Sequence, residues 1–468
     1  MSERDRPLIL SLFEMASPVH LSHGLWTHPQ DQRHRVADLS FWRELGSLLE
    51  HGTFDELFLA DVLGAYDVFD DGLGTAVREG FQIPALDPLI VLGALADATD
   101  HLGLVATFST TYEPPFAFAR RLATLDHLSK GRIGWNIVTS YLTNAARNFG
   151  LEDQIEHDAR YEIADEFLEV VYRLLLQSWD DGAIVADRDR RVYAESDAVH
   201  YIDHDGPRFR VAGPSLTAPS AQRLPVLFQA GSSLRGLDFA ATHAEVVFVG
   251  GSTLDDIRDN VDAIRAKAEE FGRDADTIAF LSAAHVIVAE TEQAAHEKAA
   301  DYARYRTPRE ALAQPARTAD LSTYEPTELV EDIIRREDHG YRLLIRGWRP
   351  GQTVADVLAK SSPEKSRIGG DWTIVGDPVQ VASRLEQIAD YAHLDGFNLS
   401  QDVSFESARD FIELAVPELR RRGLARSSYR DGETLRERLS RGRSGPQPHE
   451  SHSAWRVQSR LEAASRSR

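Results

Sequence analysis

Three apolar runs that have the composition of buried strands end in polar side chains. Asp61 follows the run 57–60, Thr107 ends the run 102–108, and Asn136 lies within the run 131–140. A strand buried on both faces should be apolar throughout, so polar groups gathered at its carboxyl end need a reason. Capping of the next helix, by Thr139 or Ser140 for example, is one explanation. A ligand site at the carboxyl edge of a barrel is the other.

A fourth run ends in the loop 229–236, which reads Gln-Ala-Gly-Ser-Ser-Leu-Arg-Gly. Gly231, Ser232 and Ser233 offer backbone N–H groups and hydroxyls just before an expected helix, and such a helix start suits a phosphate. No Gly-x-Ser-x-Gly signature of a nucleophile–base–orienter triad accompanies it. The polar residues therefore indicate a site that holds a cofactor, which would perform the difficult chemistry.

A loop after the first expected strand is rich in histidine and aromatic residues: His20, His23, Trp26 and His28. These lack the His-x-His or His-Glu-x-x-His spacing of a metal site. Lining of a pocket mouth and an ordinary surface loop are the alternatives. The sequence contains no cysteine, which excludes disulfides, thiolate catalysis and zinc–sulfur sites.

The elements that would position these residues alternate between strands and helices. Strands are expected at 8–13, 57–60, 102–108 and 131–140, and again at 226–230, 246–249, 278–288 and 396–399. Eight strand–helix units indicate parallel strands with right-handed crossovers and predict a (β/α)8 barrel. An open doubly wound sheet is the alternative, but no Gly-x-Gly-x-x-Gly follows the first strand.

Length and charge limit the possible classes of protein. The chain has 468 residues, 42% of them hydrophobic, enough for one large barrel domain or two ordinary domains. A net charge of −22 argues against nucleic acid or an anionic membrane surface as the main partner. The charged start and the lack of an apolar run long enough to span a bilayer predict a cytoplasmic protein.

Three segments do not fit a minimal barrel. The barrel domain is expected to span 1–440, with insertions at about 178–224 and 302–372. Long insertions of this kind are usually lids or oligomer contacts, and we expect 302–372 to be a lid. The remainder, 441–468, is rich in Ser, Arg, Gly and Pro and is predicted to be disordered.

Residues 131–140, Gly-Arg-Ile-Gly-Trp-Asn-Ile-Val-Thr-Ser, resemble the signature of the nitrilotriacetate monooxygenase group of bacterial luciferase-like, FMN-dependent monooxygenases. This group also includes dibenzothiophene-sulfone, EDTA and long-chain alkane monooxygenases. The likeness continues, in the family's order, at 58–61, 229–233, 375–382, 395–399 and 416–423. It covers roughly residues 8 to 440 and is specific to the group, not to one substrate.

The resemblance implies a luciferase-like barrel that binds reduced FMN supplied by a separate NAD(P)H:FMN reductase. By that likeness, Asp61 and Thr107 lie beside the isoalloxazine and Asn136 under it. His157 and Tyr161 reach the flavin chain or phosphate, and Ser232 or Ser233 holds the phosphate. The spacing of four residues places His157 and Tyr161 on one face of a helix start. A homodimer or homotetramer is expected from the family.

The same resemblance implies a two-component monooxygenase. Reduced flavin and O2 would form a C4a-(hydro)peroxyflavin, which oxygenates a small organic substrate, and the protein would exclude water. His20, His23, Trp26, His28, Arg346 and Trp348 are the candidate substrate contacts, although an exposed charge run also explains Arg346 and Trp348. No residue stands out as the catalytic acid or base. A deazaflavin (F420)-dependent oxidoreductase, a non-catalytic flavin-binding protein and a metal-dependent barrel hydrolase are the alternatives.

Overall fold

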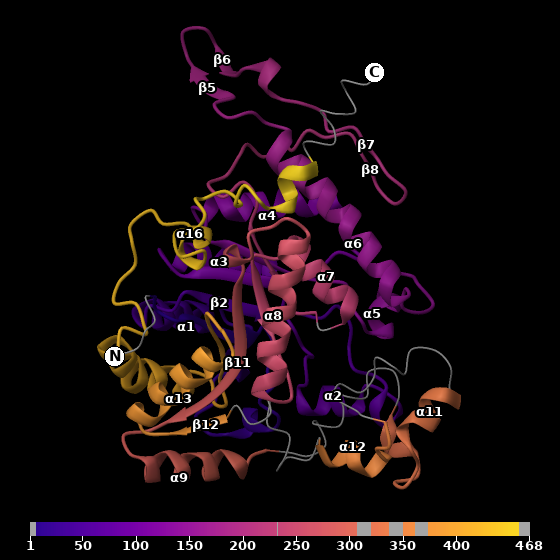
Figure 1. Ribbon diagram of the computed structural model, residues 1–468, viewed down its shortest axis with the longest axis vertical. Coiled ribbons are helices and arrows are strands. Elements are labelled where there is room, and N and C mark those ends of the chain that lie inside the picture. Colours follow the sequence, from indigo (N-terminus) through magenta and orange to yellow (C-terminus); the bar gives the residue numbers. More distant parts are fainter. Residues whose placement is uncertain (1–5, 232, 307–319, 337–349, 361–372, 458–468) are drawn as a thin grey trace.

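Eight parallel strands form a closed ring in the structure, a computed structural model that describes residues 6–231, 233–306, 320–336, 350–360 and 373–457 (Figure 1). In chain order they are β1 (Ile9–Met15), β2 (Glu56–Ala60), β3 (Gly103–Ser109), β4 (Ile133–Val138), β9 (Val226–Gln229), β10 (Val246–Val249), β11 (Ala279–Val288) and β13 (Gly396–Ser400). The ring runs β1-β2-β3-β4-β9-β10-β11-β13 and returns to β1. The pairing of β10 with β11 closes it, so the fold is a (β/α)8 barrel and the open-sheet alternative is wrong.

Helices cover the outside of the ring, as expected for right-handed crossovers. They are α1 (Leu39–His51), α3 (Pro88–Ala98), α4 (Pro115–Leu128), α6 (His157–Tyr172), α7 (Leu234–His243), α8 (Leu254–Glu270), α9 (Glu292–Ala303) and α13 (Pro378–Tyr391), with shorter pieces α2 (Gly74–Glu79), α5 (Thr143–Asn148), α14 (Glu406–Asp410) and α15 (Val416–Arg421). Asp87 caps α3: its side chain accepts from Leu89 N at 2.8 Å, with Pro88 in the first turn.

Alternation along the strands separates an outer core from the barrel interior. Trp135 of β4 faces outward and is fully buried, with its ring 4.7 Å from that of Phe118 on α4. The inward-facing residues form a second cluster of buried apolar side chains: Ile9, Phe58, Val105, Val226, Phe228, Val246, Ala279 and Leu281. The interior is therefore packed with side chains and is not a pore.

One end of the barrel is closed and the other is open. Helix α16 (Leu435–Leu439) caps the amino-terminal end, where Leu435 and Leu439 join the interior cluster and Leu435 N donates to Gly131 O at 2.9 Å. At the carboxyl end, Ala230, which follows the buried strand β9, is exposed, and so is Ala283 within the buried strand β11. Phe248 of β10 is half-buried. We call this open end, lined by the inward-facing residues at the carboxyl ends of the strands, the barrel mouth.

Two stretches carry elements beyond the eight strand–helix units of the barrel. The segment 178–224 carries two small hairpins that project from it (Figure 1), formed by β5 (Ile184–Asp187) with β6 (Val192–Ala194) and β7 (His204–Asp205) with β8 (Arg210–Val211). The described parts of 302–372 include α11 (Val330–Arg336) and α12 (Val354–Lys360), which pack in a small cluster of their own. Beyond them, β12 (Thr373–Gly376), which the sequence did not predict, pairs with the end of β11.

The prediction of a disordered tail is wrong for residues 441–457. His452 is 2% exposed and its Nε2 lies 2.9 Å from His243 O, and Ala454 is fully buried. Arg441 Nη1 lies 2.8 Å from Asp395 Oδ1. The composition is polar, but a few side chains find buried partners on the barrel, and these contacts order the segment. Residues 458–468 lie outside the described residues. In the described part of the chain, no helix is both long and apolar enough to cross a membrane.

Candidate active site at the barrel mouth

Thr107 and Asn136 lie side by side on β3 and β4, because the two residues pair directly in the register of the parallel strands. Both are 4% exposed, and Asn136 Nδ2 donates to Thr107 Oγ1 at 3.0 Å. Asn136 Oδ1 is buried and has no hydrogen-bond partner among the described residues. A buried acceptor without a partner is rare in folded proteins. The pair is therefore suited to a ligand that brings its own N–H group.

Asp61 follows β2 at the same end of the barrel and is partly buried. Burial raises the pKa of its carboxyl to about 7, the Val62 backbone N–H opposes this shift, and Asp87 adds to it. The side chain thus changes charge near neutral pH. It is the acidic member of the predicted set, and the structure places it one strand away from Thr107.

The starts of α6 and α7 meet beside the mouth. The rings of His157 and Tyr161 lie 5.2 Å apart at the start of α6. Ser233 is the N-cap of α7, and its Oγ accepts from Gly236 N at 3.0 Å. A Cβ at Gly231 or at Gly236 would lie 2.9 Å from the Tyr161 hydroxyl, so glycine at both positions permits this close approach.

We call the site formed by His157, Tyr161, Ser233 and Arg235 at these two helix starts the cradle. It combines a helix N-terminus, hydroxyl groups and a cation, the groups that hold phosphates. The cation is Arg235, whose Cζ lies 5.5 Å from the centre of the Tyr161 ring and whose guanidinium pairs with Asp165. Burial raises the pKa of the Tyr161 hydroxyl, with the Ser233 hydroxyl opposing the shift, so Tyr161 stays protonated and can donate. Arg235 was not predicted as a site residue, although it lies in the loop that was. Ser232 lies outside the described residues.

The capping explanation for Thr139 and Ser140 is not what the structure shows. The N-cap of α5 is Leu142. Thr139 O instead accepts from Thr111 Oγ1 at 2.8 Å, and Ser140 O accepts from the buried guanidinium of Arg160. The polar end of β4 is thus occupied by a loop whose carbonyls are held by other side chains.

The four candidate substrate contacts of the first loop are separated in space. The His20 ring lies 4.9 Å from that of Phe13, an inward-facing residue of β1 at the mouth. His23 packs at 5.3 Å on Phe81, and Trp26 is 40% exposed. His28 turns toward α9, with its Nε2 3.1 Å from Asp301 Oδ2. The structure therefore brings His20, but not His28, to the barrel mouth. Arg346 and Trp348 lie outside the described residues.

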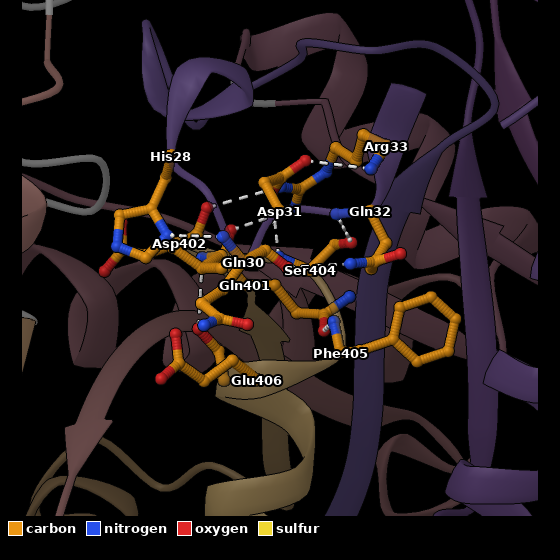
Figure 2. A network of polar contacts seen from close by, with 12 residues as sticks. His28, Gln30, Asp31, Gln32, Arg33, Gln401, Asp402, Ser404, Phe405 and Glu406 are labelled. Carbon is orange, nitrogen blue, oxygen red and sulfur yellow. Dashed lines mark hydrogen bonds and ion pairs between the residues drawn. The ribbon is translucent and has the colours of Figure 1, made fainter. Parts of the chain in front are cut away.

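A buried ionic network that the sequence did not reveal fixes the loops after β1 and β13 (Figure 2). Arg33 is 3% exposed; its Nη1 lies 2.6 Å from Asp31 Oδ2 and its Nη2 3.2 Å from Glu14 Oε2. It also donates to the backbone carbonyls of Gln401 and Asp402, at 3.1 and 3.2 Å. One guanidinium thus ties two strand ends together at the rim of the mouth.

Metal chemistry of the hydrolase type needs a cluster of ligands. Across the described ranges, no group of three or more His, Asp or Glu side chains is arranged to hold a metal ion. The polar side chains that converge at the mouth are instead neutral or hydrogen-bonding, apart from Asp61.

Comparison with known proteins agrees with this geometry. The chain matches the luciferase-like monooxygenase family over residues 19–393. It is 44% identical to the long-chain alkane monooxygenase of Geobacillus thermodenitrificans over 434 residues, 92% of this chain and 93% of that protein. It is 39% identical to the dimethyl-sulfide monooxygenase of Hyphomicrobium sulfonivorans (92% and 90% covered) and 35% identical to nitrilotriacetate monooxygenase component A of Aminobacter aminovorans (92% and 96%).

Solved structures show the same relationship. The crystal structure of long-chain alkane monooxygenase superposes with a TM-score of 0.89 at 43% identity, covering 97% of this chain and all of that one. A riboflavin lyase with modified FMN and riboflavin matches with a TM-score of 0.88 at 40% identity (97% and 99%). An F420-dependent reductase from Methanopyrus kandleri, at 15% identity, shares the fold alone. The chain belongs to the bacterial luciferase-like monooxygenase family and is a flavin-dependent monooxygenase.

Proposed function

We propose that the barrel mouth binds reduced FMN and that the protein uses it with O2 to oxygenate a small, uncharged organic molecule. When bound, the reduced flavin supplies the electrons that activate O2. The observation that carries the cofactor assignment is the Thr107–Asn136 pair, whose buried Oδ1 acceptor has no protein partner. A flavin ring carries the N–H donor that this acceptor lacks.

The phosphate of FMN would lie at the cradle formed by His157, Tyr161, Ser233 and Arg235. Ser232 belongs to the same proposal from the sequence alone. Asp61 would lie beside the ring, where its neutral form fits an apolar environment better than its ionised form. The riboflavin lyase relative, whose crystal structure holds a modified FMN, supports flavin over deazaflavin as the cofactor.

The substrate class follows from the lining of the mouth. Six inward-facing side chains around it are apolar: Phe13, Ala60, Val138, Phe228, Phe248 and Ala283. They stand beside the polar Thr107 and Asn136, to which we assign the flavin. The apolar part gains free energy by covering an apolar molecule, and none of these six side chains offers a positive charge to a polycarboxylate. This favours a substrate of the alkane or thioether type, like those named for two of the relatives, over a chelator like that of the third.

A separate reductase would supply the reduced flavin. Nitrilotriacetate monooxygenase is named as component A, which implies a second component in that system. We propose the same division of labour here, with a transient contact between the two proteins.

The test is an anaerobic titration with reduced FMN, followed by mixing with 18O-labelled O2 in the presence of dimethyl sulfide or an n-alkane. We expect saturable binding, and one labelled oxygen atom in the product for each flavin oxidised. Binding without label in any product would refute the proposed substrate class. Absence of reduced-FMN binding would refute the proposed function as a whole.

A further inference from the structure

The wall of the mouth opposite the proposed flavin site carries a buried histidine on β11. The ring of strands places β11 opposite β3 and β13 opposite β4, so this wall faces Thr107 and Asn136 across the barrel. Residues 279 and 281 of β11 belong to the interior cluster. Because side chains of a strand alternate between its faces, Ala283 and His285 lie on the same inward side, one step and two steps nearer the opening.

Ala283 shows that the space in front of this wall is open. It is exposed, whereas its neighbours Ser282 and Ala284 on the outward face are buried. His285 lies just above it and is 2% exposed. The histidine is therefore at the boundary between the open mouth and the packed rim.

Two polar atoms at this boundary have no partner. His285 pairs with Ser400 in the register of β11 and β13. His285 Nε2 and Ser400 Oγ are both buried, and neither has a hydrogen-bond partner among the residues that the structure describes. A histidine that served only to fill the core would be expected to satisfy both ring nitrogens.

The other ring nitrogen faces a carboxylate. His285 Nδ1 lies 3.6 Å from Asp402 Oδ1, and Asp402 is 2% exposed. Arg306 lies 2.5 Å from the same oxygen, and Arg33 donates to the Asp402 backbone carbonyl. Burial tends to raise the pKa of Asp402, but His285, Arg306 and Arg33 outweigh it and hold that pKa below its ordinary value. Asp402 is thus an ionised, immobilised partner for the ring.

We propose that His285 is the proton-transfer residue of the monooxygenase reaction and that Asp402 is its positioning residue. A histidine beside a buried carboxylate, with its second ring nitrogen unpartnered at the edge of the reacting space, fits a general acid–base catalyst. The inference rests on the proposed function, because it needs reduced flavin and O2 in the mouth.

The proton balance is simple. In each turnover, one oxygen atom enters the substrate, the other leaves as water, and both hydrogens of that water come from the reduced flavin. His285 gives a proton from Nε2 to the departing oxygen and recovers one as the flavin becomes oxidised, so its own protonation state is unchanged at the end. Without substrate, both oxygen atoms leave as hydrogen peroxide, and that release uses the same proton.

Other charged groups surround the pair and are engaged with one another. Arg33 binds Glu14 and Asp31, and on α9 and α14 Lys298 lies 3.8 Å from Glu406. Each of these groups has a charged partner of its own, so none is free to serve as the proton donor in place of His285.

The experiment is rapid mixing of the protein–reduced FMN complex with O2, without substrate, between about pH 5.5 and 8.5, the range in which a histidine titrates. The rate at which oxidised flavin appears is measured in the wild type, H285N and D402N. The matched control is H393N, which removes the exposed His393–Asp262 pair (3.1 Å) on the surface. Reduced-FMN affinity and the melting temperature are measured for every variant.

We expect the wild-type rate to fall as pH rises across this range. In H285N the rate should drop by about 100-fold at the acid end and lose its pH dependence, with the reduced-FMN affinity within twofold of the wild type. D402N should also lower the rate, by less than H285N, because it removes the charge beside the ring but keeps the histidine. H393N should match the wild type.

An H285N profile that follows the wild type would overturn the inference while the proposed function stands. If the variants do not fold, a flat wild-type rate across this range overturns the inference, since it excludes a titrating proton donor. A wild type that does not bind reduced FMN would refute both proposals.

Discussion

Replacing Arg33 by Met should destabilise the protein strongly, because it removes a buried cation that pairs with two buried carboxylates and lies near a third. Glu14 and Asp31 lie 3.2 and 2.6 Å from the guanidinium. Asp402 adds both a backbone carbonyl and a nearby charge. Removing one partner of a buried ion pair typically costs about 3–5 kcal/mol, since it leaves an uncompensated charge. Methionine fills much of the same volume, so the loss would be electrostatic.

Thermal unfolding measures this loss. An unfolding entropy of about 2.1 cal/mol/K per residue gives roughly 1 kcal/mol/K for 468 residues, so R33M should melt about 3–5 °C below the wild type. R33K should lose less stability than R33M, because lysine keeps the positive charge. It should still lose some, because it lacks the planar guanidinium with its five N–H donors. R35A is the matched control: it removes the exposed Arg35–Glu44 pair and should leave the melting temperature unchanged.

The double variant R33M/E14Q tests the cause. If the unpaired carboxylate is responsible, neutralising Glu14 should recover part of the lost stability. The reasoning is refuted if R33M melts within about 1 °C of the wild type, or if E14Q adds a further loss to R33M instead of restoring stability.

Three further predictions follow from buried or partly buried groups. Burial raises the pKa of Glu56 inside the barrel to about 8, so the folded protein keeps this proton while the unfolded chain releases it near 4.5. The free energy of unfolding should therefore fall as pH rises between these values, by about 1.4 kcal/mol per pH unit at most. The melting temperature of the wild type should be lower at pH 8 than at pH 5, and E56Q should lose this difference. FMN affinity should weaken by up to about tenfold per pH unit above the pKa of Asp61, which is about 7, and D61N should abolish that dependence in a fluorescence titration. Deleting residues 449–468 should lower the melting temperature and expose the α7 surface to proteolysis, because His452 and Ala454 are buried; an unchanged melting temperature would show that the segment does not dock.

The barrel could be predicted because each of its strands can be identified from a short stretch of sequence. Each of the eight is a short apolar run after a turn, and each lies within a few residues of its expected position. The strand β12 escaped prediction because its four residues, Thr373–Gly376, only extend the ladder of β11. The folded part of the tail escaped because its order depends on contacts such as His452 with His243, which lie far apart in the sequence.

Those candidate site residues that lie at the carboxyl ends of strands could be predicted from the sequence. Thr107 and Asn136 interrupt apolar runs, and the structure places them in contact. The pair His285 and Asp402 had no such signal, since neither shares a motif or a helical spacing with the other, and only the parallel register of β11 and β13 brings them together. His28 stays a prediction: its ring lies 4.7 Å from that of Tyr305, away from the barrel mouth.

The central claim, that the mouth holds reduced FMN with its phosphate at the start of α7, is tested most directly by comparing reduced FMN with reduced riboflavin. We expect the wild type to bind FMN at least about tenfold more tightly, S233A to narrow that difference, and N136A to weaken both ligands alike. Equal affinities of the wild type for the two flavins would contradict the phosphate site, and unchanged binding of both by N136A would contradict the placement of the ring.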